Sequence, residues 1–84
     1  MSWTVSFSSR ALHDLKRLDR QTRIRIVDAI ERHAATGAGD VKRLRGRDSG
    51  WRLRVGDWRV LHRYRFDASI VEIVRVVRRR DAYR

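Results

Sequence analysis

The 84-residue sequence contains no cysteine and no proline. Without cysteine, neither a disulfide framework nor a thiolate metal site can form. The three histidines, His13, His33 and His62, lie far apart and lack the spacing of metal ligands, so we expect no metal and no cofactor. Because the chain also has no internal repeat and no linker-like segment, we expect one domain over residues 1–84.

Long apolar runs are also missing. No stretch approaches the roughly 20 apolar residues that a helix needs to cross a bilayer. The first ten residues, MSWTVSFSSR, lack the charged start and continuous apolar segment of a signal peptide. We therefore expect a cytoplasmic protein without a membrane partner.

Acidic residues are scarce beside basic ones. The chain has 21 Lys+Arg against 10 Asp+Glu, for a net charge of +11, and only Lys16 and Lys42 among the basic residues are lysines. Residues 41–84 hold fourteen of these basic residues and five of the acids. A GC-rich genome would explain part of the preference for arginine, but not the excess of base over acid. Such a charge attracts polyanions, and the planar guanidinium matches phosphate.

The first half of the sequence predicts a strand and two helices. Apolar and polar residues alternate over 3–8, and Ser8 or Ser9 can then cap a helix. Asp19 can cap a second helix over 20–36, which Gly37 would end. The expected apolar positions are Leu12, Leu15 and Leu18 in the first helix and Ile24, Ile26, Val27, Ile30 and Ala34 in the second.

The second half predicts a loop and three strands. Residues 38–50 are polar, basic and punctuated by glycine, which favours a loop with one helical turn near 42–44. Alternation then indicates strands over 51–55 and 58–66, joined by a tight turn at Gly56-Asp57. A further strand is expected over 70–77, after a turn at 67–69.

This element order, β-α-α-β-β-β, predicts an α+β fold. The N-terminal helical hairpin would pack on one face of a small, mainly antiparallel, twisted sheet, because each has an apolar face that needs covering. His62, Trp51 and Trp58 would lie toward the core, although Trp51 could instead stack on a base. His13 and His33 would lie on the surface.

Arginines of the opposite alternation would share the exposed face of that sheet. Arg52 and Arg54 are two residues apart, and Arg59 can reach the same face from the next strand. A solvated basic face and a phosphate-binding cradle are both compatible with this pattern. The absence of neutralising acids in the cluster favours the cradle.

The sequence resembles the RelE/ParE family of bacterial type II toxins. The resemblance is carried by KRLRG at 42–46, WRLRVGDWRVLHRY at 51–64 and VEIVRVVRRRDAYR at 71–84, and it covers almost the whole chain. It implies a toxin that a co-produced antitoxin neutralises. In the RelE-like branch it implies a metal-independent endoribonuclease that cuts messenger RNA in the ribosomal A site. The implied partners are therefore an antitoxin with an acidic contact surface, the ribosome and mRNA.

The resemblance also implies the roles of individual residues. The implied catalytic residues are Arg52, Arg54, Arg59, Arg79 and Tyr83, and the implied RNA or phosphate contacts are Lys42, Arg43, Arg45, Arg78 and Arg80. Arg52 and Arg54 stand where relatives commonly have lysine, so charge stabilisation suits them better than a general-base role. The alternative is a ParE-like toxin, which inhibits DNA gyrase and cuts no RNA.

Overall fold

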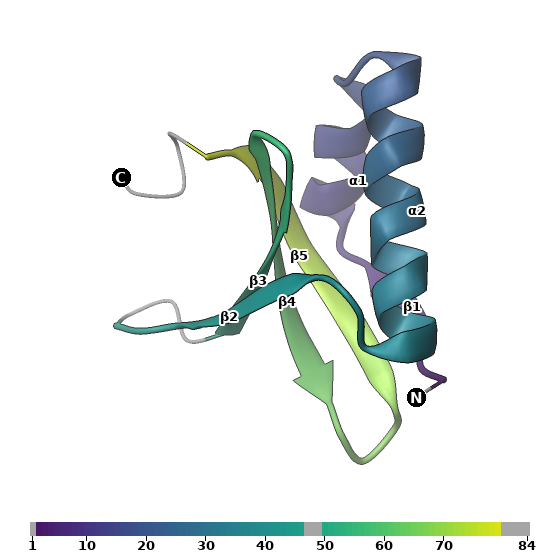
Figure 1. Ribbon diagram of the computed structural model, residues 1–84, viewed down its shortest axis with the longest axis vertical. Coiled ribbons are helices and arrows are strands. Elements are labelled where there is room, and N and C mark those ends of the chain that lie inside the picture. The colour runs from purple at the N-terminus through teal and green to yellow at the C-terminus, as the bar shows by residue number, and fades with distance from the viewer. Residues whose placement is uncertain (1, 47–49, 80–84) are drawn as a thin grey trace.

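The computed structural model describes residues 2–46 and 50–79. In chain order the elements are β1 (Thr4–Phe7), α1 (Ser9–Lys16), α2 (Arg20–Thr36), β2 (Asp40–Leu44), β3 (Gly50–Val55), β4 (Trp58–Arg65) and β5 (Ile70–Arg78). The strands form one sheet in the order β1-β5-β4-β3-β2, in which only the β1–β5 pair is parallel. Both helices lie on the same side of this twisted sheet (Figure 1). The predicted α+β class, with a helical hairpin on a mainly antiparallel sheet, is confirmed.

Side-chain caps define both helix starts. The Ser8 hydroxyl accepts a hydrogen bond from the Ala11 amide at 3.0 Å, and the Asp19 carboxylate accepts one from the Thr22 amide at 3.1 Å. These caps satisfy amides that have no partner within the helix. At the other end of α2, Gly37 has a φ of 80°, the left-handed conformation expected there. The predicted helix boundaries are therefore confirmed.

The predicted apolar stripes are only partly correct. Leu12 is 48% exposed and Ile24 is 47% exposed, whereas Ile26 and Ile30 are fully buried. Sequence periodicity predicts an amphipathic helix, but it does not determine which of two adjacent apolar rows faces the core. Packing against the sheet selects the row that contains Ile26, Ile30 and Ala34.

The prediction of a loop with a helical turn near residues 42–44 is wrong. Residues 40–44 form β2, which pairs with β3 so that Lys42 lies opposite Arg52 and Asp40 opposite Arg54. The sequence DVKRL does not alternate strictly, so local pattern gives little sign of a strand. Hydrogen bonding to the free edge of β3 creates the strand.

His33 is buried, which corrects its predicted surface position. Only 4% of His33 and 2% of His62 is exposed, and both rings contact the hydroxyl of Tyr64, with Nε2–Oη distances of 2.6 and 3.1 Å. Each Nδ1 lies near a backbone carbonyl oxygen, that of Ala38 or Val60. Since one hydroxyl has one hydrogen, Tyr64 can donate to only one of the two imidazoles. His62 lies in the core, as predicted, and His13 is exposed.

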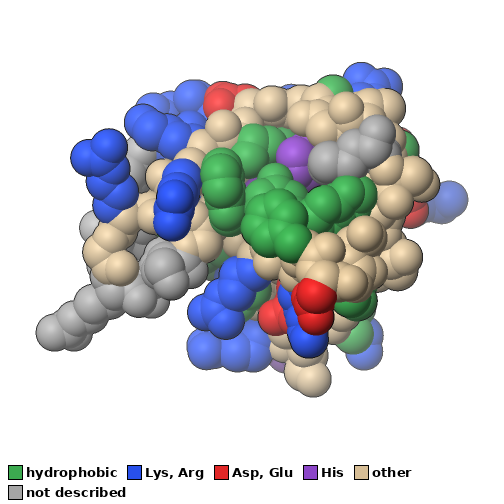
Figure 2. All heavy atoms as spheres, turned by 90° about the horizontal axis from the view of Figure 1, so that it is seen from below, with side chains coloured by type: hydrophobic (Ala, Val, Ile, Leu, Met, Phe, Trp, Pro, Cys, Tyr) green, Lys and Arg blue, Asp and Glu red, His purple; other side chains and the backbone are tan. Residues whose placement is uncertain are grey.

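Aromatic rings gather beside these histidines. Tyr64 makes edge contacts with Trp3 and Trp51, at centroid distances of 5.5 and 5.3 Å, and lies 5.7 Å from Phe66. Trp51 is half-buried in this cluster, while Trp58 packs against the core. Seen from below, hydrophobic side chains gather in the middle of the molecule, with basic side chains around the margin (Figure 2).

A carboxylate from α1 fixes the last strand. Asp14 accepts hydrogen bonds from Arg75 Nε at 2.8 Å, from Arg75 Nη2 at 3.1 Å and from the Val76 amide at 2.9 Å. Burial raises the pKa of Asp14, but the Arg75 and Val76 hydrogen bonds outweigh it and hold the pKa below its usual value. These bonds lie next to Val74, which the β4–β5 register skips between Ile73 and Arg75.

Burial makes His62 a source of acid sensitivity. It lowers the pKa of His62 from 6.5 to about 4, so the unfolded chain takes up this proton first as the pH falls. The free energy of unfolding should therefore decrease between pH 6.5 and 4, by about 3 kcal/mol from this group. Urea unfolding across this range should show the slope in the wild type and a flatter profile in His62→Gln. An equal slope in both proteins would contradict the assignment.

Candidate nucleic-acid interface

The strand register brings the three central arginines onto one face of the sheet. Arg54 lies directly opposite Arg59 in the β3–β4 pair, and Arg52 follows on the same face of β3. The helices cover the other face, where Leu53, Val60 and Val76 belong to the core. The predicted shared face of Arg52, Arg54 and Arg59 is therefore confirmed as geometry.

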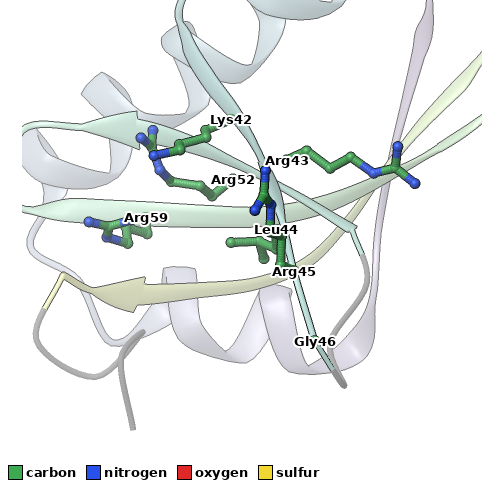
Figure 3. A pocket seen from close by; sticks show the side chains of 7 residues that line it. All are labelled: Lys42, Arg43, Leu44, Arg45, Gly46, Arg52 and Arg59. Atoms are coloured by element: carbon green, nitrogen blue, oxygen red, sulfur yellow. The ribbon is translucent and has the colours of Figure 1, made fainter.

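A hollow of about 1040 Å³ opens over β2, β3 and β4 on this side. Its lining residues are Lys42, Arg43, Leu44, Arg45, Gly46, Arg52 and Arg59 (Figure 3). Five of these seven residues are basic and none is acidic. Like charges at close range repel one another, and an anion in the hollow would relieve that repulsion.

Two of these arginines are buried in the sheet. Arg52 is 9% exposed and Arg59 is 6% exposed. Arg52 Nη1 donates to the backbone oxygen of Asp40 at 2.9 Å and to its carboxylate at 3.2 Å. The Arg52 guanidinium is thus fixed before any ligand arrives. Fixed charges of this kind need no reorganisation when they bind a phosphate.

Arg43 differs from its neighbours in direction. Its side chain extends away from Arg52 and Arg59, whereas Lys42 lies on their side (Figure 3). Strand pairing explains this, because Arg43 lies opposite Trp51 and therefore shares the other face of the sheet. Arg43 borders the hollow but does not point to its centre.

The other predicted site residues lie elsewhere. Arg54 is exposed and borders a separate hollow of about 460 Å³, together with Arg25 and Arg32 of α2. Arg78 stacks over the Trp58 ring, with its Cζ 5.2 Å from the ring centroid. Arg79 is exposed, and its amide donates to the Asp57 carbonyl at 2.8 Å. Arg80 and Tyr83 lie outside the described residues.

Asp40 is the site residue that sequence reasoning misses. The segment that contains it is a predicted loop, so no register connects Asp40 with Arg52. An acidic residue just before a basic segment was the only available signal. Within residues 2–46 and 50–79, no group of three or more His, Cys, Asp or Glu side chains could hold a metal ion. Neither helix in these ranges is long and apolar enough to cross a membrane.

Comparisons with known proteins identify the family. A family model described as "ParE toxin of type II toxin-antitoxin system, parDE" matches residues 5–83. A protein from Methanocaldococcus jannaschii, named "Putative toxin RelE1", is 32% identical over 88 residues, which cover 100% of this chain and 98% of that protein. The chain therefore belongs to the RelE/ParE family of type II toxin–antitoxin toxins.

Solved structures agree with this assignment. The toxin–antitoxin complex RelBE2 from Mycobacterium tuberculosis contains a chain with a TM-score of 0.84 and 26% identity, covering 93% of this chain and 92% of that chain. The archaeal RelE–RelB complex from Pyrococcus horikoshii gives a TM-score of 0.78 over 94% of this chain and 97% of that one. At 20% identity, the second likeness shows the fold alone.

The two lysines of the chain offer a matched test of the hollow. Lys42 lines it, whereas Lys16 ends α1, and both are exposed. Lys42→Ala should weaken binding of a short fluorescent single-stranded DNA oligonucleotide and reduce the salt slope of log K by about 0.7, the value for one phosphate contact on a single strand. Lys16→Ala should change neither quantity. Equal losses in both variants would mean that net charge, rather than this hollow, binds the oligonucleotide.

Proposed function

We propose that this toxin is a ribosome-dependent endoribonuclease, which cuts messenger RNA in the ribosomal A site. The observation that carries the proposal is the basic hollow with Arg52 and Arg59 buried in its wall. A surface that only attracts RNA does not need buried guanidinium groups. A site that stabilises charge on one reacting phosphate benefits from such groups, because they act in a water-excluded environment and need no reorganisation.

The proposed reaction uses a nucleophile that RNA itself supplies. The 2′-hydroxyl attacks the adjacent phosphorus and loses its proton to solvent water, and the P–O5′ bond breaks. The leaving 5′-oxygen takes up a proton, so the products are a 2′,3′-cyclic phosphate and a 5′-hydroxyl. Negative charge accumulates on the phosphate oxygens in the transition state, where Arg52 and Arg59 would stabilise it. Lys42 and Arg45 would hold the flanking phosphates. In this scheme the protein aligns the reacting atoms and neutralises charge, and no metal takes part in a step.

Arg79 and Tyr83 complete the proposed site. Arg79 would stabilise or protonate the leaving 5′-oxygen, and Tyr83 would stack on the nucleotide beside the cut. The hydrogen bond from the Arg79 amide to Asp57 supports this role, because it ties the segment after β5 to the turn that precedes Arg59. Arg54 and Arg78, which lie outside the hollow, would contact RNA or ribosomal phosphates. Arg80 would be a further phosphate contact.

We further propose a cognate antitoxin as the partner of this chain. The Mycobacterium tuberculosis and Pyrococcus horikoshii structures are toxin–antitoxin complexes. A chain with a net charge of +11 favours an acidic contact surface on its partner. An antitoxin of this kind would neutralise the toxin if it covered the hollow.

A second candidate function is inhibition of DNA gyrase. It is favoured by the matching family model, whose description names the ParE toxin. This function would need a protein-binding surface and no RNA cleavage. Brief induction in cells separates the two candidates, because gyrase inhibition alters plasmid supercoiling while transcripts stay intact.

Arginine substitutions test the cleavage proposal. Arg59→Ala should reduce cleavage of mRNA on programmed ribosomes by about 10²-fold, since one charge-stabilising donor is lost. Arg20→Ala, which removes the same charge from the exposed start of α2, should leave the rate within about twofold. The rate is measured by primer extension, and the ends of the fragments are analysed for cyclic phosphate.

Folding must be controlled, because Arg59 is buried. Circular dichroism and thermal unfolding of each variant report whether the substitution leaves the fold intact. A folded Arg59→Ala variant with wild-type cleavage would refute the assigned role. Absence of cleavage by the wild type on ribosomes, together with altered supercoiling, would refute the endoribonuclease and favour the gyrase candidate.

A further inference from the structure

We propose that Asp40 is a positioning residue, which holds Nη1 of the Arg52 guanidinium so that the edge formed by Nε and Nη2 can bind two oxygens of one RNA phosphate. The inference rests on the proposed function and assigns the geometry of its main anion contact. Asp40 lies on β2, diagonally across from Arg52 on the same face of the sheet. A carboxylate on this face is unexpected, because the hollow has only cationic and uncharged lining residues.

The hydrogen bonds occupy one nitrogen of Arg52. Nη1 carries two hydrogens, and its two acceptors are the backbone oxygen and the carboxylate oxygen of the same residue, Asp40. Within the described part of the chain, Nε and Nη2 of Arg52 have no protein acceptor. These two nitrogens form the edge of the guanidinium that matches two phosphate oxygens in a bidentate contact.

Burial makes this arrangement rigid. The Arg52 side chain is 11% exposed, whereas that of Asp40 is 59% exposed. The carboxylate therefore remains hydrated while it holds a buried partner, so its desolvation cost is small. Arg52 can keep one orientation without the loss of side-chain freedom that binding would otherwise impose.

The charge of Asp40 and its positioning role act in opposite directions. A carboxylate next to the hollow repels RNA, so its charge alone weakens binding. Its hydrogen bond to Arg52 instead improves the alignment of a phosphate, and misalignment at a reacting centre is costly. If Asp40 acts only through its charge, removal of the carboxylate should strengthen RNA binding. If it positions Arg52, removal should weaken RNA binding.

Asp40→Asn and Asp67→Asn form the matched pair of variants. Both raise the net charge by one, and Asp67 lies in the exposed β4–β5 turn. On programmed ribosomes, Asp40→Asn should reduce kcat about tenfold, because misalignment affects the chemical step. Asp67→Asn should leave kcat unchanged, and Asp40→Glu should restore part of the lost rate.

A second measurement does not depend on cleavage. Titration of the ¹⁵N-labelled protein with a 2′-O-methylated RNA oligonucleotide should shift the Arg52 Nε–H resonance in the wild type. In Asp40→Asn this shift should require about tenfold more oligonucleotide, although the variant is more positive. This experiment remains informative even if the wild type proves inactive on ribosomes, so a failure of the endoribonuclease proposal can be told apart from a failure of the positioning proposal.

The outcomes that would overturn the positioning role are specific. If Asp40→Asn binds the oligonucleotide more tightly and matches Asp67→Asn in kcat, Asp40 acts only through its charge. If Asp40→Asn unfolds at a lower temperature and loses binding, oligonucleotide binding by Asp40→Glu distinguishes a positioning role from a loss of stability. A stable Asp40→Glu variant without any recovery of oligonucleotide binding would also overturn the proposal.

Discussion

The alternation of side chains along β3 and β4 is the constraint on which this structure depends. Every second residue of these strands must enter the core beneath the helices, so the residues between them must share the opposite face. Leu53 and Val60 bury the apolar side, and Arg52 and Arg59 are thereby brought together across the strand pair. One register thus determines both the stability of the sheet and the position of the cations.

Sequence alone predicts the elements that follow a regular pattern. Some features depend only on neighbours in the chain and can therefore be predicted from local sequence. These are the caps at Ser8 and Asp19, the turn at Gly56 and the alternation around Arg59. β2 cannot be predicted from local sequence, because its hydrogen bonds come from β3. For the same reason the sequence predicts neither the contact of Asp40 with Arg52 nor the burial of His33, since each residue acquires its partner only through tertiary contacts.

The candidate site is a smaller set than the resemblance implies. Lys42, Arg45, Arg52 and Arg59 gather around the hollow, while Arg54 and Arg78 face other surroundings. A motif lists residues by their spacing, but the twist of the sheet decides which of them meet. The excess of arginine therefore divides into a cluster that could stabilise charge at one phosphate and a surrounding surface that could guide a polyanion toward it.

β2 is also the edge of the sheet, and its composition has a consequence for solubility. An edge strand has unpaired backbone groups that can pair with another chain and start aggregation. Exposed lysine and arginine on such a strand oppose this, because two copies would have to bring like charges together. Lys42 and Arg43 are both exposed on β2. The cations that border the hollow therefore also protect a strongly basic protein from self-association at its open edge.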